Sequence, residues 1–246
     1  MKTWQEAALD YSAGGLKPKD ITKKIKSEFG LTNMYHKIYY LCKVKSKPQV
    51  EEKKRVAIQN QEPEHHWDKW DGTETIRFAI MGDTQLGSKY AQLTYLHNFY
   101  DLCEKQGIKN VYHTGDITEG LKMRPGHEYE LYETSADEMS DDVVKNYPKR
   151  DGITTHFITG NHDASIYKHV GYDIGQAIAF LRPDMRYLGR DCAVFNLTPN
   201  CTLELSHPWD GTAYALSYKI QKMLEAMEAD SKPNILAVGH YHKAEY

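Results

Sequence analysis

The chain has 246 residues, of which 40% are hydrophobic and 26% are charged, and its formal net charge is −3. This length fits one or two domains and is enough to bury a substantial core. No run of about 18 apolar residues is present, which excludes a membrane-spanning helix, and the first ten residues lack the apolar stretch of a signal peptide. The 17 glycines and 9 prolines are too few for a collagen-like chain.

The four cysteines are scattered along the chain and form no Cys-x-x-Cys pair. They are Cys42, Cys103, Cys192 and Cys201. A zinc ribbon or a disulfide framework is therefore not expected, and reduced thiols in a cytoplasmic protein are the plain interpretation.

Charge is distributed unevenly along the sequence. Residues 1–60 carry 13 Lys and Arg against 6 Asp and Glu, a net charge of +7, whereas residues 61–246 carry 18 against 28, a net charge of −10. A basic front and an acidic body predict two units with different partners.

Residues 1–45 have the pattern of three short helices. In the first, apolar residues recur at helical spacing from Trp4 to Tyr11. The second follows Pro18 and ends at Gly30, and the third begins near Thr32. Three helices joined by brief turns resemble a helix-turn-helix module.

In such a module the third helix contacts DNA bases, and lysines of the second helix contact phosphates. The residues predicted to contact nucleic acid are Lys23, Lys24, Tyr35, His36 and Lys37. The alternative is a helical cap or an oligomerisation arm whose lysines are only solvated. The two interpretations predict different partners, and both stay open.

Residues 46–73 are polar and charged, contain Pro48 and Pro63, and show no periodicity, so we predict a linker. The adjacent pair His65-His66 is interpreted as surface residues rather than metal ligands. Residues 74–246 are then the second domain.

In residues 74–246, short apolar runs alternate with amphipathic segments. The predicted strands are 76–81, 109–113, 154–158, 193–197, 201–205 and 235–238, and the predicted helices are 93–103, 129–147, 170–181 and 212–229. This alternation favours an α/β fold with helical crossovers.

Five of the apolar runs end in Gly or Ser followed by a polar residue. The polar residues are Asp83, Asp116, Asn161, His207, His240 and His242. Singly, such residues are usually turns, caps or ordinary surface and core positions. Because ligands of α/β sheets bind beyond the carboxyl ends of strands, the set is expected to converge as a metal site.

The ordered motifs resemble those of the calcineurin-like metallophosphoesterase family. They are Gly82-Asp83-Thr84-Gln85, Gly115-Asp116-Ile117-Thr118-Glu119-Gly120, Gly160-Asn161-His162-Asp163, Ser206-His207 and Gly239-His240-Tyr241-His242. The resemblance covers residues 74–246. It implies an α/β/β/α fold, in which a sandwich of two mixed sheets is flanked by helices and holds two metal ions at one edge.

The resemblance also implies a ligand set for two divalent metal ions. Asp83, Gln85 and His242 correspond to the first site, Asn161, His207 and His240 to the second, and Asp116 to the bridge. This donor set suits Mn²⁺, with Fe or Zn²⁺ as alternatives. Two ions about 3.5–4 Å apart activate a shared hydroxide for attack on phosphorus and neutralise developing charge.

Further roles follow from the same resemblance. His162 matches the acid that protonates the leaving oxygen, and Glu119 matches a carboxylate that orients this histidine in some members. Asp163 is interpreted as a turn or cap residue. In the loop 121–129, Arg124 and His127 are candidates for contact with a substrate phosphate, and an ordinary exposed loop is the alternative.

Two features depart from the family pattern. Gln85 stands where the family usually has histidine, and an amide oxygen binds transition metals less well than an imidazole, which predicts a weaker first site. The sequence also ends soon after His242, where members normally continue with strands of the second sheet. We expect either a truncated chain or a minimal version of the domain.

Three functional hypotheses result. The first is a metal-dependent phosphodiesterase or nuclease directed to nucleic acid by residues 1–45. The second is a small-molecule phosphatase or phosphodiesterase, with the front module serving oligomerisation. The third is a non-catalytic DNA-binding protein, which the intact Asp116, Asn161 and His207 argue against. None of the three predicts a membrane partner.

Overall fold

The computed structural model describes residues 2–30, 64–67, 70, 72–73, 75–211 and 215–242. The chain divides into two compact units, Met1–Glu62 and Pro63–Tyr246. The predicted third helix, with Tyr35, His36 and Lys37, lies outside the described residues. No helix within the described ranges is long and apolar enough to cross a membrane.

Two packed helices form the described part of the first unit. α1 (Trp4–Ala13) begins with a capping box, in which Thr3 and Glu6 each accept a hydrogen bond from the other's backbone N–H. α2 (Pro18–Phe29) begins with a proline and ends at Gly30, whose φ of 67° is left-handed. The buried residues between the helices are Ala7, Ala8, Ile21 and Ile25. The predicted contact residues Lys23 and Lys24 are exposed on α2.

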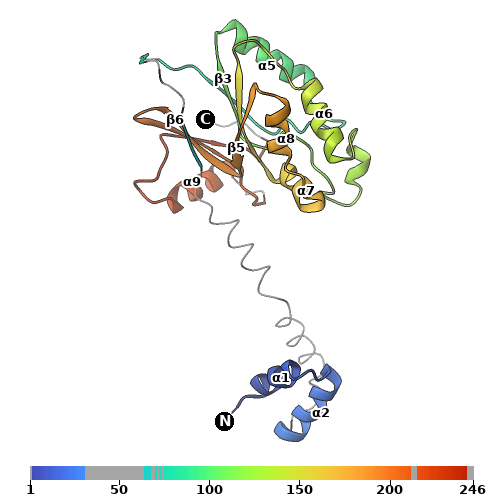
Figure 1. Cartoon of the computed structure of the whole chain (residues 1–246). Helices are drawn as coiled ribbons and strands as arrows, with labels where there is room; N and C mark the ends of the chain where they lie inside the picture. Colours follow the sequence, from blue (N-terminus) through green and yellow to red (C-terminus); the bar gives the residue numbers. More distant parts are fainter. Residues whose placement is uncertain are drawn as a thin grey trace. The chain divides into compact units, whose positions relative to one another are not determined.

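The described residues of the second unit form two four-stranded sheets (Figure 1). The first has the order β2-β3-β4-β5, with all strands parallel, and comprises β2 (Ala79–Met81), β3 (Asn110–His113), β4 (Thr154–Thr159) and β5 (Met185–Arg190). The second has the order β1-β6-β7-β8 and comprises β1 (Glu64–Trp67), β6 (Cys192–Thr198), β7 (Cys201–Ser206) and β8 (Ile235–Val238). In this sheet β6 and β7 pair antiparallel, and the other pairs are parallel.

Helices connect the parallel strands, because a parallel pair requires a crossover. They are α5 (Leu93–Lys105), the 3₁₀ helix η1 (His127–Glu130), α6 (Ala136–Asn146), α7 (Asn161–Val170), α8 (Ile174–Leu181) and α9 (Leu216–Ala226). Figure 1 shows α5 to α8 on one face of the β2–β5 sheet and the sheet that contains β6 on its other face.

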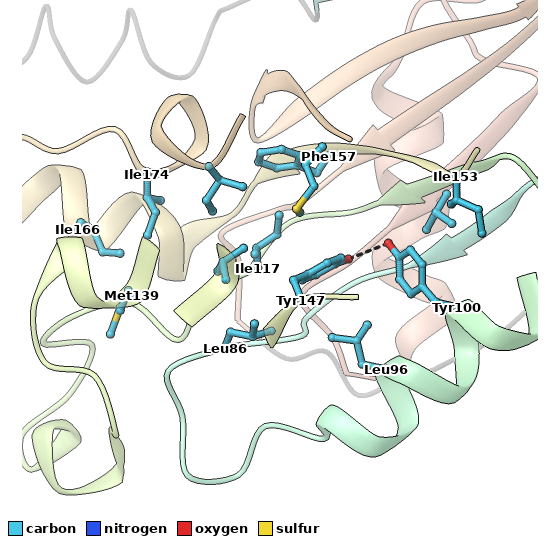
Figure 2. Packing of buried hydrophobic residues seen from close by; sticks show 14 of the residues in the cluster. Leu86, Leu96, Tyr100, Ile117, Met139, Tyr147, Ile153, Phe157, Ile166 and Ile174 are labelled. Carbon is cyan, nitrogen blue, oxygen red and sulfur yellow. Dashed lines mark hydrogen bonds between the residues drawn. The ribbon is translucent and has the colours of Figure 1, made fainter. Parts of the chain in front are cut away.

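Two apolar cores separate these layers. The larger lies between the β2–β5 sheet and the helices, and its buried cluster includes Phe157 of β4, Met139 of α6 and Ile166 of α7 (Figure 2). At its edge the Tyr100 hydroxyl donates to the Tyr147 hydroxyl at 3.2 Å. The second core lies between the two sheets and contains Tyr112, Ile158, Leu188, Phe195, Leu203 and Leu205. The predicted α/β fold with two sheets is confirmed.

One predicted boundary is wrong. Residues 64–67, assigned to the linker by their polarity, form β1 and pair with β6 in the register His66↔Phe195. His66 Nε2 also lies 2.8 Å from the Leu188 carbonyl oxygen. The segment lacks an apolar pattern because β1 is an edge strand, and edge strands carry more polar side chains than central ones.

Candidate metal centre

Loops at the carboxyl ends of β2, β3, β4, β7 and β8 meet at one edge of the second unit. The backbone N–H of Asp83 donates to the Gly115 carbonyl at 3.0 Å, and the N–H of His162 donates to Asp116 Oδ1 at 2.8 Å. The N–H of His240 lies 3.0 Å from Asp83 Oδ2. Backbone hydrogen bonds therefore hold together segments that are far apart in the sequence.

Left-handed backbone is concentrated in these loops. Among the described residues, the non-glycine positions with positive φ are Asp83, Gln85, Asp116, Lys122, Asp191, His240 and His242. Five of the seven belong to the predicted ligand set. A left-handed conformation costs a residue with a side chain roughly 1–2 kcal/mol. Such strain gathers at functional sites, where the surrounding structure holds it in place.

Close packing explains why glycine precedes the predicted ligands. A Cβ at Gly160 would lie 2.3 Å from Asp116 Oδ1 and 2.7 Å from His207 Nε2. A Cβ at Gly115, whose φ is 98°, would lie 2.6 Å from His207 Nδ1. The Gly-Asp and Gly-Asn pairs are thus positions where two loops approach too closely for any side chain.

Four side chains present ligand atoms to one another at this edge. They are Asp116, Asn161, His207 and His240. Nε2 of His207 lies 3.0 Å from Asn161 Oδ1 and 3.0 Å from Asp116 Oδ2. Nδ1 of His240 lies 2.9 Å from the same Asn161 oxygen. Ligand atoms of the two histidines and Asp116 all lie within 4.8 Å of one another.

Backbone carbonyls set the tautomer of both histidines. Nδ1 of His207 donates to the Thr114 carbonyl at 2.7 Å, and Nε2 of His240 donates to the Asp210 carbonyl at 2.8 Å. A carbonyl only accepts, so in each neutral ring the other nitrogen carries a lone pair. Those two lone pairs point at the carboxylate and amide oxygens, which are acceptors too.

A group of facing acceptors requires a cation among them. Oδ2 of Asp116 is buried and has no hydrogen-bond partner, although it lies 3.0 Å from His207 Nε2. Burial lowers the pKa of His207, but the carboxylates of Asp116 and Asp83 outweigh this effect and raise the pKa to about 9. In the absence of a metal, a proton on the His207 ring therefore supplies the positive charge among these groups. The donor set therefore fits a divalent transition-metal ion.

The residues predicted for the first site form a looser group. His242 Nε2 lies 3.4 Å from Asp83 Oδ1 and 3.4 Å from Gln85 Nε2, and the His242 side chain is 54% exposed. Burial raises the pKa of Asp83, but the nearby His242, His207 and His113 outweigh it, so this pKa lies below its ordinary value. The structure brings Asp83, Gln85 and His242 together beside Asp116. This group has more solvent access than the second group.

Asp163 braces two of the loops. Its carboxylate accepts from the backbone N–H groups of Ile117, Thr118 and Gly160 at 2.9–3.1 Å and from the Thr118 hydroxyl at 2.7 Å. It is fully enclosed, and burial, with Asp116 nearby, raises its pKa to about 6 against the effect of these hydrogen bonds. This arrangement matches the predicted turn-and-cap role.

His162 is held by a backbone group rather than by a carboxylate. Its Nδ1 donates to the Glu119 carbonyl oxygen at 2.6 Å, whereas the Glu119 carboxylate lies 3.9 Å away. That carboxylate instead accepts from His127 Nε2 at 2.9 Å. The expected pairing of the Glu119 side chain with His162 is therefore not present.

The two residues predicted to contact substrate phosphate are placed differently. His127 has no exposed surface, and its Nδ1 accepts from the Met123 backbone N–H at 3.3 Å. The prediction of direct phosphate contact is wrong for His127, because its polarity serves the buried pair with Glu119. Arg124 is half-exposed and forms an ion pair with Glu130.

Two important groups are invisible in the sequence. The carbonyls of Thr114 and Asp210 orient His207 and His240, but every residue carries a carbonyl, so no residue type marks them. The structure alone shows that the Asp210 side chain also accepts from the Tyr241 hydroxyl, at 2.8 Å, within the last motif.

Of the comparisons with known proteins, the family match bears on this site. No curated protein sequence matches the chain. A similar solved structure is Pseudomonas putida nuclease MPE, with 13% identity, a TM-score of 0.28, and coverage of 55% of this chain and 56% of that chain. The chain thus spans just over half of that structure, and a likeness this distant carries no information about substrate. The model of the calcineurin-like phosphoesterase family matches residues 76–244, which contain all the predicted ligands. The chain therefore belongs to the calcineurin-like phosphoesterase family, whose members hydrolyse phosphoesters with divalent metals.

Proposed function

We propose that this phosphoester hydrolase is a phosphodiesterase that cleaves nucleic acid with two divalent ions, Mn²⁺ being the working metal. The observation that carries the metal assignment is the convergence of Asp116, Asn161, His207 and His240 with both histidine tautomers fixed by carbonyls. In this proposal Asp83, Gln85 and His242 would hold the first ion, and Asp116 would serve both.

Bound divalent ions supply a nucleophile at neutral pH and neutralise charge on the phosphate. The chain's own residues supply position and a proton. His162 sits beside Asp116 because its backbone N–H donates to that carboxylate. Its Nδ1–H is engaged by the Glu119 carbonyl, so the proton available for the leaving oxygen is the one on Nε2.

Support for nucleic acid as substrate comes from the first unit. Residues 1–60 carry a net charge of +7, and Lys23 and Lys24 are exposed on α2. A basic helical unit in the same chain as a phosphodiesterase domain is suited to contact phosphates, which gives binding that weakens steeply with salt. The small-molecule alternative predicts no such dependence.

The first experiment tests the reaction. With Mn²⁺, the wild type is expected to hydrolyse bis(p-nitrophenyl) phosphate and DNA faster than p-nitrophenyl phosphate. Asp116→Asn and His207→Ala should each reduce the rate by roughly 10³-fold or more, because both remove a ligand atom. His169→Ala, at an exposed histidine of α7, is the matched control. Wild-type activity of His207→Ala with unchanged circular dichroism would refute the site.

The second experiment tests the substrate class. In the full-length chain, Lys23→Ala/Lys24→Ala should weaken DNA binding and reduce the slope of log affinity against log salt by up to about 2. Lys145→Ala/Lys149→Ala, which removes two exposed lysines of the second unit, is the control. Identical affinity and slope in wild type and the first variant would favour a small-molecule substrate.

A further inference from the structure

A cavity lined by several aromatic residues adjoins the first-site residues. Its volume is about 450 Å³, within the usual range for small-ligand pockets. Its lining includes the first-site residues Asp83, Gln85 and His242. It also includes the aromatic residues Tyr90, Tyr95 and Phe99. The cavity is therefore continuous with the proposed metal centre.

The aromatic residues of the cavity come from α5 and from the turn that precedes it. Tyr95 and Phe99 are four residues apart in α5, so they share one face of that helix. Tyr90 lies in a turn where its backbone N–H contacts the Ser88 hydroxyl at 3.3 Å and its carbonyl accepts from Gln92 Nε2 at 3.0 Å. The Tyr90 and Tyr95 side chains are 69% and 71% exposed, so their rings are available to a ligand.

Charge indicates which part of a substrate fits here. Of the described residues that line the cavity, only Asp83 and His242 are ionisable at neutral pH. Both belong to the group predicted to hold the first metal ion, and they lie 3.4 Å apart. The remaining lining is aromatic, aliphatic or neutral polar. A second phosphate would find no cation in it, whereas a flat uncharged ring would find faces on which to stack.

We propose that this cavity is a nucleobase subsite, in which a base next to the scissile phosphate stacks on Tyr90 and Tyr95. The inference rests on the proposed phosphodiesterase function and adds the part of the substrate that the enzyme would recognise, the nucleobase. Gln85 joins the two regions, because it both lines the cavity and contacts His242 at 3.4 Å. In this proposal a phosphate bound at the first-site residues would have its attached nucleoside in the neighbouring aromatic cavity.

Three esters with the same leaving group test the subsite. The p-nitrophenyl esters of thymidine 5′- and 3′-phosphate are compared with methyl p-nitrophenyl phosphate, which has the same charge and no base. Wild type should favour the better thymidine ester by roughly 5- to 150-fold in kcat/KM, the range expected for stacking of one base. Tyr95→Ala should remove most of that preference, because it should slow the thymidine ester far more than the methyl ester. Tyr95→Phe should keep it.

A binding measurement checks the same point without turnover. Calorimetry of thymidine 5′-phosphate and methyl phosphate with Mn²⁺-loaded protein should show tighter binding of the nucleotide in wild type and near-equal binding in Tyr95→Ala. Tyr129→Ala, which removes a tyrosine that is 77% exposed and does not line the cavity, should behave as wild type.

The outcomes separate the subsite from the function. Hydrolysis of the methyl ester with no preference for either thymidine ester would overturn the subsite and leave the phosphodiesterase standing. Equal losses in Tyr95→Ala and Tyr129→Ala would also overturn it. If none of the three esters is hydrolysed, the proposed function fails, and the calorimetric comparison then decides the subsite alone.

Discussion

Nε2 of His127 lies 2.9 Å from Oε1 of Glu119, and this contact directs the carboxylate away from His162. The same glutamate contacts His162 through its backbone carbonyl, at 2.6 Å from Nδ1. The backbone of residue 119 therefore orients the proposed acid, and His127 holds the Glu119 side chain in a buried pair.

Removing His127 should destabilise the protein. His127→Phe leaves the buried Glu119 carboxylate without its donor, which is expected to lower the free energy of unfolding by about 1–3 kcal/mol. Urea denaturation measures this loss. The matched control is Arg124→Ala, which breaks a partly exposed ion pair and should cost at most about 1 kcal/mol. Equal losses in the two variants would contradict the buried pair.

His162 and Glu119 should differ in their effects on turnover. His162→Ala is expected to lower kcat by about 10²–10⁴-fold while metal content stays near wild type, since alanine keeps the backbone N–H to Asp116. Glu119→Gln retains the carbonyl contact and should cost less than tenfold. The His162→Ala loss should shrink for p-nitrophenolate, a leaving group that needs little protonation. An equal loss for all leaving groups would argue against an acid role.

Metal affinity should rise with pH. Burial lowers the pKa of His207, but Asp116 and Asp83 raise it to about 9, so metal-free protein carries a proton on this ring at pH 7. A metal must displace that proton, so affinity should increase up to about tenfold per pH unit below 9. The same shift means that metal-free protein loses stability as pH rises from about 6.5 through 9.

Calorimetry measures this coupling directly. Titrations of Mn²⁺ between pH 6.5 and 8, in buffers of different ionisation enthalpy, count the protons released. About one proton released at pH 7, with tighter binding at pH 8, is the expected result. Flat affinity with no proton release would show that His207 binds no metal or is already neutral.

Much of the second unit is predictable from sequence, because strand-end polarity repeats. The predicted strand 235–238 matches β8, and the predicted pair 193–197 and 201–205 matches β6 and β7 within one residue at each end. The sequence does not predict β5, since Met185–Arg190 mixes charged and apolar residues. The structure shows that the burial of these residues is also irregular. α7 was missed because Asn161 and His162 both begin the helix and belong to the ligand motif.

The candidate site is predictable in its residue types and less so in its contacts. The ligand set converges because parallel strands bring their carboxyl ends to one edge, which periodicity and spacing indicate. The partner of Glu119 depends on how the loop 121–129 folds back, and that loop has no periodicity. Its burial of His127 comes from tertiary packing, which a local pattern does not contain.

Gly160→Ala tests the close packing of the centre. The new methyl would lie 2.3 Å from Asp116 Oδ1, and the φ of −107° suits alanine, so the effect is steric rather than conformational. We expect weaker metal binding by at least tenfold and a loss of about 1–3 kcal/mol in stability. Gly211→Ala, where a Cβ meets nothing within 4 Å, should leave both unchanged. Normal affinity in Gly160→Ala would mean that the two loops can separate freely.

Gln85→His tests whether the first site is weak because it lacks an imidazole. Gln85 lies beside His242, with Nε2 atoms 3.4 Å apart, and its φ of 47° holds it in the loop after Asp83. Wild type should bind one Mn²⁺ firmly and a second loosely, because an amide oxygen is a poorer ligand than imidazole nitrogen. The histidine should tighten the weaker step, by roughly 10–100-fold on analogy with other changes around metals.

Calorimetric titration of Mn²⁺ into metal-free protein distinguishes the two steps of this prediction. The control is Gln176→His, which adds an exposed histidine on α8 and should leave both affinities unchanged. Activity in wild type should keep rising after one equivalent is bound, whereas in Gln85→His it should saturate near two equivalents. Two sites of equal affinity in wild type, unaltered by the substitution, would show that Gln85 does not limit the first site. In that case the amide serves the neighbouring aromatic cavity, which it also lines.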